Sequence, residues 1–361
     1  MATSAHRTDR PFVESWRRRK SAAFDLQDNS TARGTTRFDL WGRPVEVYGN
    51  ANFSIYSAQA CNAKCRFCVE ELRPASRGRQ LVAQKIVEAD DGRYFAALAA
   101  TLDALGPLRP TISITGGEPS IDPRLPAILA LCARYASPRR SLTTNGSGLM
   151  QVRDGRRVID QIVDAGIDHL NISRAHVDHD ANARLMVFRE GLDLGQLREV
   201  VATARAGGVR VRLSCVLIAG AVESLDDIRA YLAFARSIGV DNVIFRQLMK
   251  PDDENMLHNF VIAFSRRRGV RLEALLDALG ASTDFVFQRQ IVGYYYYVEV
   301  WKHGDIDVVF EEADLAQLER TKRTMPGVIH ELIFHPNARL ASTWQPWDGV
   351  LGPPPADAGA R

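Results

Sequence analysis

Three cysteines stand close together in the segment QACNAKCRFCVEEL. They are Cys61, Cys65 and Cys68, with three residues between the first two and two residues between the last two. Thiolates are soft ligands that suit zinc and iron–sulfur clusters. Three thiolates in one short loop can hold three corners of a four-iron cluster and leave the fourth iron open to a non-protein ligand. The spacing therefore predicts a cluster with one open coordination position.

A structural zinc site is the competing interpretation of the same residues. Such sites normally use four protein ligands, often in two C-x2-C pairs, and the sequence has no second pair. A zinc knuckle would need a histidine as its fourth ligand. Cys132 lies on an apolar helical stripe and Cys215 on the apolar face of a predicted strand, so both are predicted to be core residues.

The segment CNAKCRFC resembles the signature of radical S-adenosylmethionine (SAM) enzymes, C-x3-C-x-aromatic-C, with Phe67 as the aromatic residue. Later segments resemble further motifs of the same superfamily, in the same order. These segments are Thr115, Gly116, Gly117, Glu118 and Pro119 (GGEP); Thr143, Thr144, Asn145 and Gly146; Asn171 and Ser173; and Val216, Ile218, Gly220 and Glu223 (G-x-I-x-G-x-x-E). Val216 stands where the last motif has its first glycine. The resemblance covers about residues 51–250.

The resemblance implies a role for each of these segments. It implies that Cys61, Cys65 and Cys68 hold a [4Fe-4S] cluster and that the other motif residues bind SAM. The GGEP backbone would receive the methionine amino group. The residues of the third and fourth strands would contact the ribose and carboxylate, and the Ile218–Gly220 segment would lie beside adenine. The implied chemistry is reductive cleavage of SAM to a 5′-deoxyadenosyl radical, with a flavodoxin or ferredoxin as reductant.

Six predicted strands position these motifs. Strand-like runs occur at 52–57, 111–115, 140–144, 168–174, 209–217 and 241–248, and stretches of helical period separate them. Strand and helix in alternation favour parallel strands joined by right-handed crossovers. Each motif falls at, or just past, the C-terminal end of a predicted strand. That is the end at which parallel barrels place their chemistry.

The two faces of these strands differ in polarity. The apolar face carries Phe53, Ile55, Ile112, Ile114, Leu170, Ile172, Val209, Val211, Leu213, Cys215, Val243 and Phe245. The other face carries Ser54, Tyr56, Ser113, Thr115, Ser141, Thr143, Asn171, Ser173, Arg210, Arg212, Ser214 and Arg246. A parallel strand covered by helices on both sides would be apolar on both faces. The pattern therefore predicts a barrel with a wet, ligand-filled interior, unless a one-residue slip in register reverses the faces. By resemblance, the fold is α/β, a partial (β/α)6 TIM-like barrel.

We expect four segments along the chain. Residues 1–50 form an N-terminal arm and lead-in, residues 51–250 the barrel, residues 251–351 a small α+β extension at one end of the barrel, and residues 352–361 a flexible tail. Within the extension, residues 271–280 are predicted to be helical. A strand, a turn at His303, a strand and a helix should follow, and then a last strand near 328–335.

The composition excludes several classes of protein. The chain has 361 residues, of which 25% are charged and 46% hydrophobic, so it is neither disordered, nor collagenous, nor a coiled-coil rod. It has no apolar run of 18 residues and no signal-like N-terminus. With few cysteines and no signal, it is expected in the reducing cytoplasm. A net charge of +3 is too small to imply nucleic acid binding.

Four polar residues are candidates for substrate contact or catalysis: Arg212, Arg246, His176 and Lys250. Three cations at one barrel mouth suit an anionic small molecule, such as a sugar acid, a nucleotide or an amino acid. Arg212 could instead bind the SAM carboxylate or brace the barrel, and Lys250 could be a solvated loop residue. His176 and His179, with Asp178 and Asp180, resemble a second metal site, but a polar turn before a helix explains them better.

Three functional hypotheses follow. The first is a single-cluster radical SAM enzyme acting on a polar small metabolite in natural-product or nucleoside-sugar biosynthesis. The second keeps the chemistry but takes a peptide or macromolecule as substrate, with the basic run Arg17–Lys20 as its support. The third is a non-catalytic iron–sulfur or zinc sensor. No cysteine follows Cys215, so the auxiliary clusters of peptide-modifying relatives and of the molybdenum-cofactor cyclase are not expected. The FRQLMKP segment from Arg246 does resemble the cyclase group.

Overall fold

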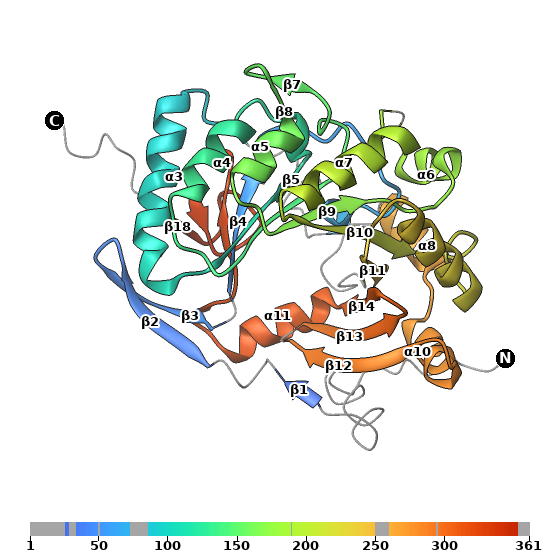
Figure 1. Cartoon of the computed structure of the whole chain (residues 1–361). Coiled ribbons are helices and arrows are strands. Elements are labelled where there is room, and N and C mark those ends of the chain that lie inside the picture. The colour runs from blue at the N-terminus through green and yellow to red at the C-terminus, as the bar shows by residue number, and fades with distance from the viewer. Residues whose placement is uncertain are drawn as a thin grey trace.

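The computed structural model describes residues 26–28, 34–49, 51–72, 86–188, 190–249, 260–293 and 295–352. Two of the sequence predictions, the basic run Arg17–Lys20 and the candidate Lys250, lie outside these residues. The described strands form one large sheet, in the order β1-β12-β13-β14-β11-β10-β9-β6-β5-β4-β16-β17-β18. Its curvature around one side of the molecule is visible in Figure 1.

Six parallel strands at the centre of this sheet correspond to the six predicted strands. They are β4 (Asn52–Ser57), β5 (Thr111–Gly116), β6 (Arg140–Thr144), β9 (His169–Ser173), β10 (Arg210–Leu217) and β11 (Asn242–Gln247). Each pairs in parallel with the next in chain order. The sheet stays open between its outermost strands β1 and β18, so the predicted partial (β/α)6 barrel is confirmed.

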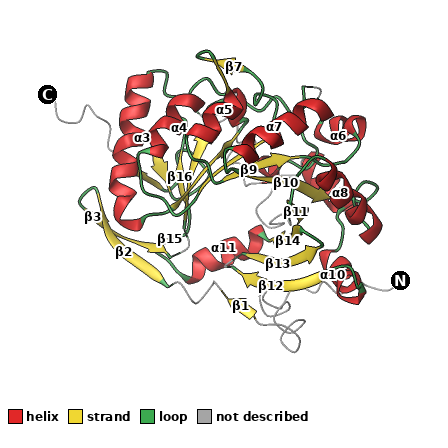
Figure 2. Ribbon diagram, in the orientation of Figure 1, coloured by secondary structure: helices red, strands yellow, loops and turns green. Residues whose placement is uncertain are grey.

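The predicted difference between the strand faces is confirmed on β5, β9 and β10, whereas on β4 Ser54 and Tyr56 of the predicted polar face are buried as well. Side chains of β10 alternate between half-buried and buried along the whole strand. Val211, Leu213 and Cys215 are at most 2% exposed. The apolar face packs against the outer helices, which line one side of the sheet in Figure 2. The polar face, which includes Arg212 and Ser214, is only partly buried and forms the concave side.

The helices lie between the strands as the sequence predicts. Those of the barrel are α3 (Asp91–Leu105), α4 (Leu125–Ala133), α5 (Val158–Asp164), α6 (His179–Met186), α7 (Leu194–Ala206) and α8 (Leu225–Ser237). Short 3-10 turns are η1 (Val69–Leu72), η2 (Gly106–Leu108) and η3 (Pro119–Ile121), and a small hairpin joins β7 (Val152–Arg153) to β8 (Arg156–Arg157). Helix α8 begins with a capping box between Ser224 and Asp227, as its sequence predicts.

The sequence before α4 has Asp122 as a plausible N-cap and Pro123 as the first helical residue, and the structure contradicts this prediction. The N-cap is Arg124 rather than Asp122, and the helix begins at Leu125. Asp122 is buried and accepts hydrogen bonds from the Ser57 hydroxyl (2.6 Å) and the Ala58 backbone N–H (3.0 Å). Its carboxylate therefore connects the end of β4 to the loop after β5. Its other carboxylate oxygen accepts a hydrogen bond from the Arg124 backbone N–H (2.9 Å), so Asp122 serves both the turn before α4 and the contact with β4.

The C-terminal third extends both edges of the barrel sheet rather than one end. On one side β14 (Ile306–Ala313) pairs in parallel with β11, and β13 (Tyr296–His303) and β12 (Val286–Val292) continue from it, with β1 (Leu26–Asp28) outermost. On the other side β16 (Leu332–Phe334) pairs with β4, followed by β17 (Leu340–Ala341) and β18 (Val350–Gly352).

The strand predicted near 328–335 is divided between two sheets. Its first part, β15 (Val328–Ile329), joins β3 (Arg43–Tyr48) and β2 (Thr35–Leu40) in a separate three-stranded sheet. Its second part is β16. The remaining helices are α9 (Phe260–Arg268), α10 (Leu272–Ala281) and α11 (Leu315–Thr324), of which α10 and α11 were predicted. Among the described residues, no helix is long and apolar enough to cross a membrane.

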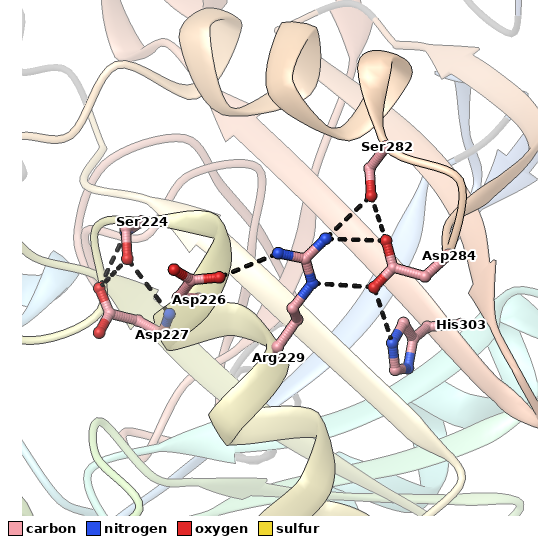
Figure 3. A network of polar contacts seen from close by, with 7 residues as sticks. All are labelled: Ser224, Asp226, Asp227, Arg229, Ser282, Asp284 and His303. Atoms are coloured by element: carbon pink, nitrogen blue, oxygen red, sulfur yellow. Dashed lines mark hydrogen bonds and ion pairs between the residues drawn. The ribbon is translucent and has the colours of Figure 1, made fainter.

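A polar network holds helix α8 to the C-terminal third (Figure 3). The Arg229 guanidinium donates two hydrogen bonds to the Asp284 carboxylate, at 2.8 and 2.9 Å, and one to the Ser282 hydroxyl. Asp226 also pairs with Arg229, and the His303 ring lies 3.4 Å from Asp284. The Arg229 hydrogen bonds lower the pKa of Asp284 below its usual range. A bidentate arginine–carboxylate pair of this kind fixes the relative orientation of the two side chains as well as their distance.

Candidate functional site

The cysteine loop follows β4 directly and is held in place by backbone hydrogen bonds. The Lys64 N–H donates to the Met186 carbonyl (3.1 Å), and the Arg66 N–H donates to the Leu185 carbonyl (3.4 Å). Both carbonyls belong to the last turn of α6, so this helix end supports the loop. Cys61 and Cys65 pack against a small apolar cluster that includes Ala175 and Phe188. The loop is therefore a fixed structure against the C-terminal ends of the strands.

The three thiols lie in one apolar environment. Burial raises the pKa of the Cys65 thiol well above its usual range, and the neighbouring thiols Cys68 and Cys61 raise it further. Burial also raises the pKa of Cys61. Cys132 and Cys215 are buried in the core, as predicted, and none of the five cysteines forms a disulfide. Three partly buried thiols that oppose one another's ionisation require a positive partner before all three become thiolates.

A single metal ion does not fit this loop. In the part of the chain that the structure describes, no three His, Cys, Asp or Glu side chains form a group that could hold one ion. This gives no support to a zinc knuckle completed by a histidine. In a four-iron cluster each cysteine binds a different iron, so the thiolates stand further apart than around one ion. The donor set of three soft ligands fits such a cluster. The assignment of these cysteines as its ligands stays a prediction.

The two glycines of the GGEP segment let two loops approach closely. A Cβ atom on Gly117 would lie 1.9 Å from the Gln59 carbonyl oxygen and 3.0 Å from the Cys61 backbone nitrogen. Gly116 has a φ of +119°, and a Cβ there would lie 2.6 Å from the Ser57 nitrogen. Only glycine allows two backbone segments to approach this closely. These glycines place the GGEP segment against the cysteine loop.

Glu118 organises the same region from inside the protein. It is 1% exposed and accepts hydrogen bonds from the Ser120 backbone N–H (2.9 Å), the Ser120 hydroxyl (2.7 Å), the Asn145 backbone N–H (2.6 Å) and the Thr144 hydroxyl. Burial raises the pKa of Glu118, and these donated hydrogen bonds oppose that rise. The side chain therefore does not project toward a ligand. It fixes the loops that follow β5 and β6.

Asn145 connects this network to the cysteines. Its side-chain Nδ2 lies 3.8 Å from the Cys61 sulfur and donates to the side-chain Oδ1 of Asn62 at 2.9 Å. The Asn62 amide in turn donates to Ser147 (3.1 Å) and Glu190 (2.9 Å). Sequence reasoning assigned Asn145 to SAM and passed over Asn62. No sequence signal identifies Asn62, because its partners come from segments 85 and 128 residues away.

The polar residues of β6 and β9 form a row on the concave face. Thr143 pairs in register with Asn171, and the Asn171 amide donates to the Thr143 hydroxyl at 3.4 Å. Its other polar atom, Oδ1, is buried without a hydrogen-bond partner. Whichever way the amide is oriented, one polar atom lacks a protein partner. Ser173 lies one step further along β9 and Thr115 lies on β5. This row fits a hydrogen-bonding cofactor such as SAM.

The segment predicted to lie beside adenine follows β10. Ile218 is buried and packs in a cluster with the partly buried Phe67 and Val216, so the aromatic residue of the cysteine motif contacts this segment. Gly220 has a φ of +79° and lines a cavity of about 780 Å³ together with Asn62, Arg66, His176 and Arg184. Glu223 is exposed, and only its backbone N–H is bonded, to Asp227. Valine at position 216 is accommodated on the concave face.

The four substrate candidates lie in different places. Arg246 forms an ion pair with Glu311 at 3.2 Å, and Arg212 donates to the side-chain oxygen of Asn242. His176 accepts a hydrogen bond from the Asp178 N–H, and Asp178 caps α6. The predicted polar turn is therefore confirmed. Lys250 lies outside the described residues. Of the three described candidates, only His176 lines the cavity beside the cysteine loop.

Comparison with known proteins gives matches in sequence and in fold. The model of the Radical SAM superfamily matches residues 55–235, half of the chain. Curated relatives named GTP 3′,8-cyclase include one from Rhodopseudomonas palustris, 24% identical over 83% of this chain and 80% of the relative. Another, from Aquifex aeolicus, is 23% identical over 56% of each chain. The matched region thus spans about half of the Aquifex protein.

Solved structures give weaker matches. The Streptococcus suis protein SuiB is 15% identical and aligns over 82% of this chain and 61% of its own, with a TM-score of 0.47. The family match begins within β4, contains the cysteine loop and the GGEP segment, and ends within helix α8. The chain therefore belongs to the Radical SAM superfamily and is an enzyme that uses a [4Fe-4S] cluster and SAM.

Proposed function

We propose that this enzyme cleaves SAM reductively and uses the resulting 5′-deoxyadenosyl radical to abstract a hydrogen atom from a polar small molecule. The observation that carries the proposal is the continuous path from Cys61 through Asn145 to Glu118. It joins the predicted cluster ligands to the GGEP segment and to the row of polar residues on the concave face. Bound together, the reduced cluster and SAM would supply one electron to the sulfonium bond and so generate the radical.

The chain's own residues have separate tasks in this proposal. Cys61, Cys65 and Cys68 bind three irons, and the turn at the end of α6 holds their loop. The Gly116–Gly117 backbone and the polar side chains of Thr143, Asn145, Asn171 and Ser173 orient SAM, with Ile218 and Gly220 beside its adenine. Exclusion of water and exact orientation are what a reactive primary radical requires.

The substrate that we propose is an anionic small molecule: a sugar acid, a nucleotide or an amino acid. Two observations favour this class. The concave face carries Arg212 and Arg246. The curated relatives are named GTP 3′,8-cyclase, a name that states a nucleotide substrate for those proteins. Biosynthesis of a natural product or a nucleoside sugar is the setting that we propose, with a flavodoxin or ferredoxin as electron donor.

A peptide or macromolecular substrate remains the second candidate, and its support is the basic run Arg17–Lys20. Deleting residues 1–25, which removes the basic run and keeps β1 and β2, separates the two candidates. A small anion should bind the truncated and full-length chains equally, whereas a peptide or RNA that needs the basic arm should lose affinity. The sensor hypothesis is not retained, because the superfamily match extends well beyond the cysteines to residue 235.

The decisive test of the chemistry is product formation. Protein reconstituted with iron and sulfide under anaerobic conditions should be brown, and with SAM and dithionite it should release 5′-deoxyadenosine and methionine. The triple variant C61A/C65A/C68A, treated identically, should release neither. A brown protein that binds SAM but forms no 5′-deoxyadenosine, with or without candidate anions, contradicts the proposed chemistry.

A further inference from the structure

Several cations line the concave face of β9, β10 and β11, and most of them have acidic partners. Arg210 pairs with Asp307, and Arg246 pairs with Glu311 at 3.2 Å. Arg212 differs from both. Its Nε donates to the side-chain oxygen of Asn242, which is neutral. Among the described residues, no carboxylate lies within ion-pair distance of Arg212, and its two terminal nitrogens have no hydrogen-bond partner.

The surroundings of Arg212 are electrostatically positive. Burial and the nearby Arg246 lower the pKa of Arg212 to about 10, although Glu311 opposes them. The guanidinium still carries its charge at neutral pH. His169, which lies on β9 two residues before Asn171, experiences the same positive field. Burial, followed by the charges of Arg212, Arg139 and Arg210, lowers the pKa of His169 to about 4. Two groups on neighbouring strands are thus both disfavoured in their charged forms.

An unpaired, partly buried charge is costly to a folded protein and is retained where another group compensates it. The position of Arg212 indicates which kind of group compensates its charge. Arg212 pairs in register with Asn171 on β9, and Asn171 pairs with Thr143 on β6. Asn171 has a buried polar atom without a protein partner. An unpaired donor and an unpaired amide atom therefore lie side by side on the concave face, next to the row predicted to contact SAM.

We propose that Arg212 binds an oxyanion of the substrate, a carboxylate or a phosphate, and thereby selects anionic over neutral substrates. This inference deepens the proposed function and rests on it only in taking the concave face as the substrate chamber. The planar guanidinium presents its terminal N–H groups in a fork that matches the two oxygens of a carboxylate or phosphate. Arg246 and Arg210 are already paired with acids and contribute through their field rather than as binding groups.

The test compares three variants of the full-length, cluster-loaded protein. R212M removes the charge and nearly keeps the volume, and R212K keeps a charge without the fork. R198M is the matched control, because Arg198 is an exposed arginine on the outer helix α7. Calorimetric titration with inorganic phosphate, gluconate and GTP covers both oxyanion chemistries, and guanosine is the neutral counterpart of GTP.

At least one of the three anions should bind the wild type. The R212M substitution should then lower the affinity for that anion at least about tenfold, which is the size expected for loss of a charge-assisted hydrogen bond. The anion affinity of R212K should lie between those of R212M and the wild type, and that of R198M should equal the wild-type value. Guanosine affinity should not change in any variant. SAM affinity and 5′-deoxyadenosine formation without substrate should be the same in R198M as in the wild type.

Three results overturn the assignment. The first is equal anion affinity in R212M and the wild type. The second is that the wild type binds none of the three anions at concentrations on the order of 10 mM. The third is a loss of SAM affinity of about tenfold in R212M, which would assign Arg212 to the SAM carboxylate. The proposed function fails separately, if the wild type makes no 5′-deoxyadenosine, and that result leaves the anion titrations interpretable.

A second readout does not depend on calorimetry or turnover. The ring of His169 can be titrated by NMR in histidine-labelled protein, with H169Q for assignment. A bound oxyanion should raise its pKa in the wild type. R212M should raise the pKa without any ligand, because it removes a neighbouring positive charge, and adding the anion should then cause no further change. An anion-dependent rise of the same size in R212M contradicts the assignment.

Discussion

At the scale of single residues, the candidate site is organised mainly by side chains that touch no ligand. Glu118 accepts four hydrogen bonds and is 1% exposed, and Asp122 joins the end of β4 to the loop after β5. Both acids lie under the loops whose backbones face the concave side. A buried acid with several donors rigidifies the segments that supply them. The precision of the site therefore depends on residues behind it.

The cysteines give the first prediction. Replacing Cys61, Cys65 or Cys68 by alanine should remove most of the iron and the brown absorbance, because three thiolates are the fewest that fill three corners of a four-iron cube. Iron and sulfide analysis after reconstitution measures this. C132A and C215A are the controls and should keep full loading at some cost in stability, since both residues are buried core. Full loading in C65A would refute the assigned ligand set.

His169 gives a prediction about pH. Its pKa is lowered from 6.5 to about 4 in the folded chain, by burial first and then by neighbouring arginines. Between these values the unfolded chain takes up a proton that the folded chain does not, so the free energy of unfolding should fall as the pH decreases from about 6.5 to about 4. The share due to His169 is about 1–2 kcal/mol after allowance for its partial exposure.

The variant H169Q should flatten this part of the stability curve. Denaturant unfolding at several pH values between 4 and 7 (roughly the window over which the two states differ) provides the measurement. H179Q is the matched control, because His179 is exposed on α6. If H169Q and wild type lose stability in parallel over this range, the low pKa of His169 is wrong.

At the scale of elements, the strands and the polarity of their faces could be predicted from the sequence, because alternation with period two is a local property. All six barrel strands occur where they are predicted. The failures share a physical cause, which is competition from distant partners. Asp122 has the type and position of a helix cap but bonds to β4. The predicted strand near 328–335 is divided because Val328 pairs with β3 and Leu332 with β4.

The candidate site divides in the same way. The order of the motifs and their placement at strand ends followed from sequence spacing. The link from Asn145 to Cys61, the role of Asn62 and the missing partner of Arg212 could not be predicted, because each depends on which side chains of separate segments meet. Resemblance assigned Glu118 to the cofactor together with its motif, and the structure places its carboxylate in the interior.

Gly117 provides the prediction at this scale. In G117A the added methyl group would lie 1.9 Å from the Gln59 carbonyl oxygen, so the cysteine loop must move away from the GGEP segment. We expect reduced cluster loading and at least about tenfold weaker SAM binding, since both depend on the relative position of these loops. G280A is the matched control. No atom lies within 4 Å of a Cβ at Gly280, which is in helix α10, so that variant should be as stable as the wild type or slightly more stable.

Iron content and equilibrium dialysis with SAM measure the two effects. Unchanged loading and SAM affinity in G117A would mean that the two loops are not held in the contact described above. A loss of both in G280A would mean that the measurements respond to general stability rather than to this contact.

At the scale of the whole molecule, the C-terminal third completes the sheet on both edges of the barrel. It supplies β14 beside β11 and β16 beside β4, so it is not a separate appendage. The Arg229–Asp284 network of Figure 3 adds a third attachment, from α8 to the segment before β12. Strands that would otherwise be edges are covered in this way, which also protects them from pairing with other chains.

The variant D284N tests that attachment. Arg229 would lose its bidentate carboxylate partner. Because this removes a partly exposed ion pair, amide hydrogen exchange in α10 and β12 should accelerate about 2–5-fold. D226N removes the more exposed partner of Arg229 and should have a smaller effect. Because the pKa of Asp284 is lowered in the folded chain, the stabilisation is complete above the ordinary aspartate pKa of 3.8 and is lost as the pH falls below it. Equal exchange in D284N and wild type contradicts this role.

The pairing of β4 with β16 has a consequence for synthesis in the cell. The strand that carries the cysteine loop receives its second neighbour from residues 332–334, about 280 positions later in the chain. While a ribosome is still making the intervening residues, β4 has one open edge, and its loop rests on an incomplete scaffold. The cluster site is therefore incomplete during translation. We expect assembly factors to insert the cluster after the complete chain has been released from the ribosome.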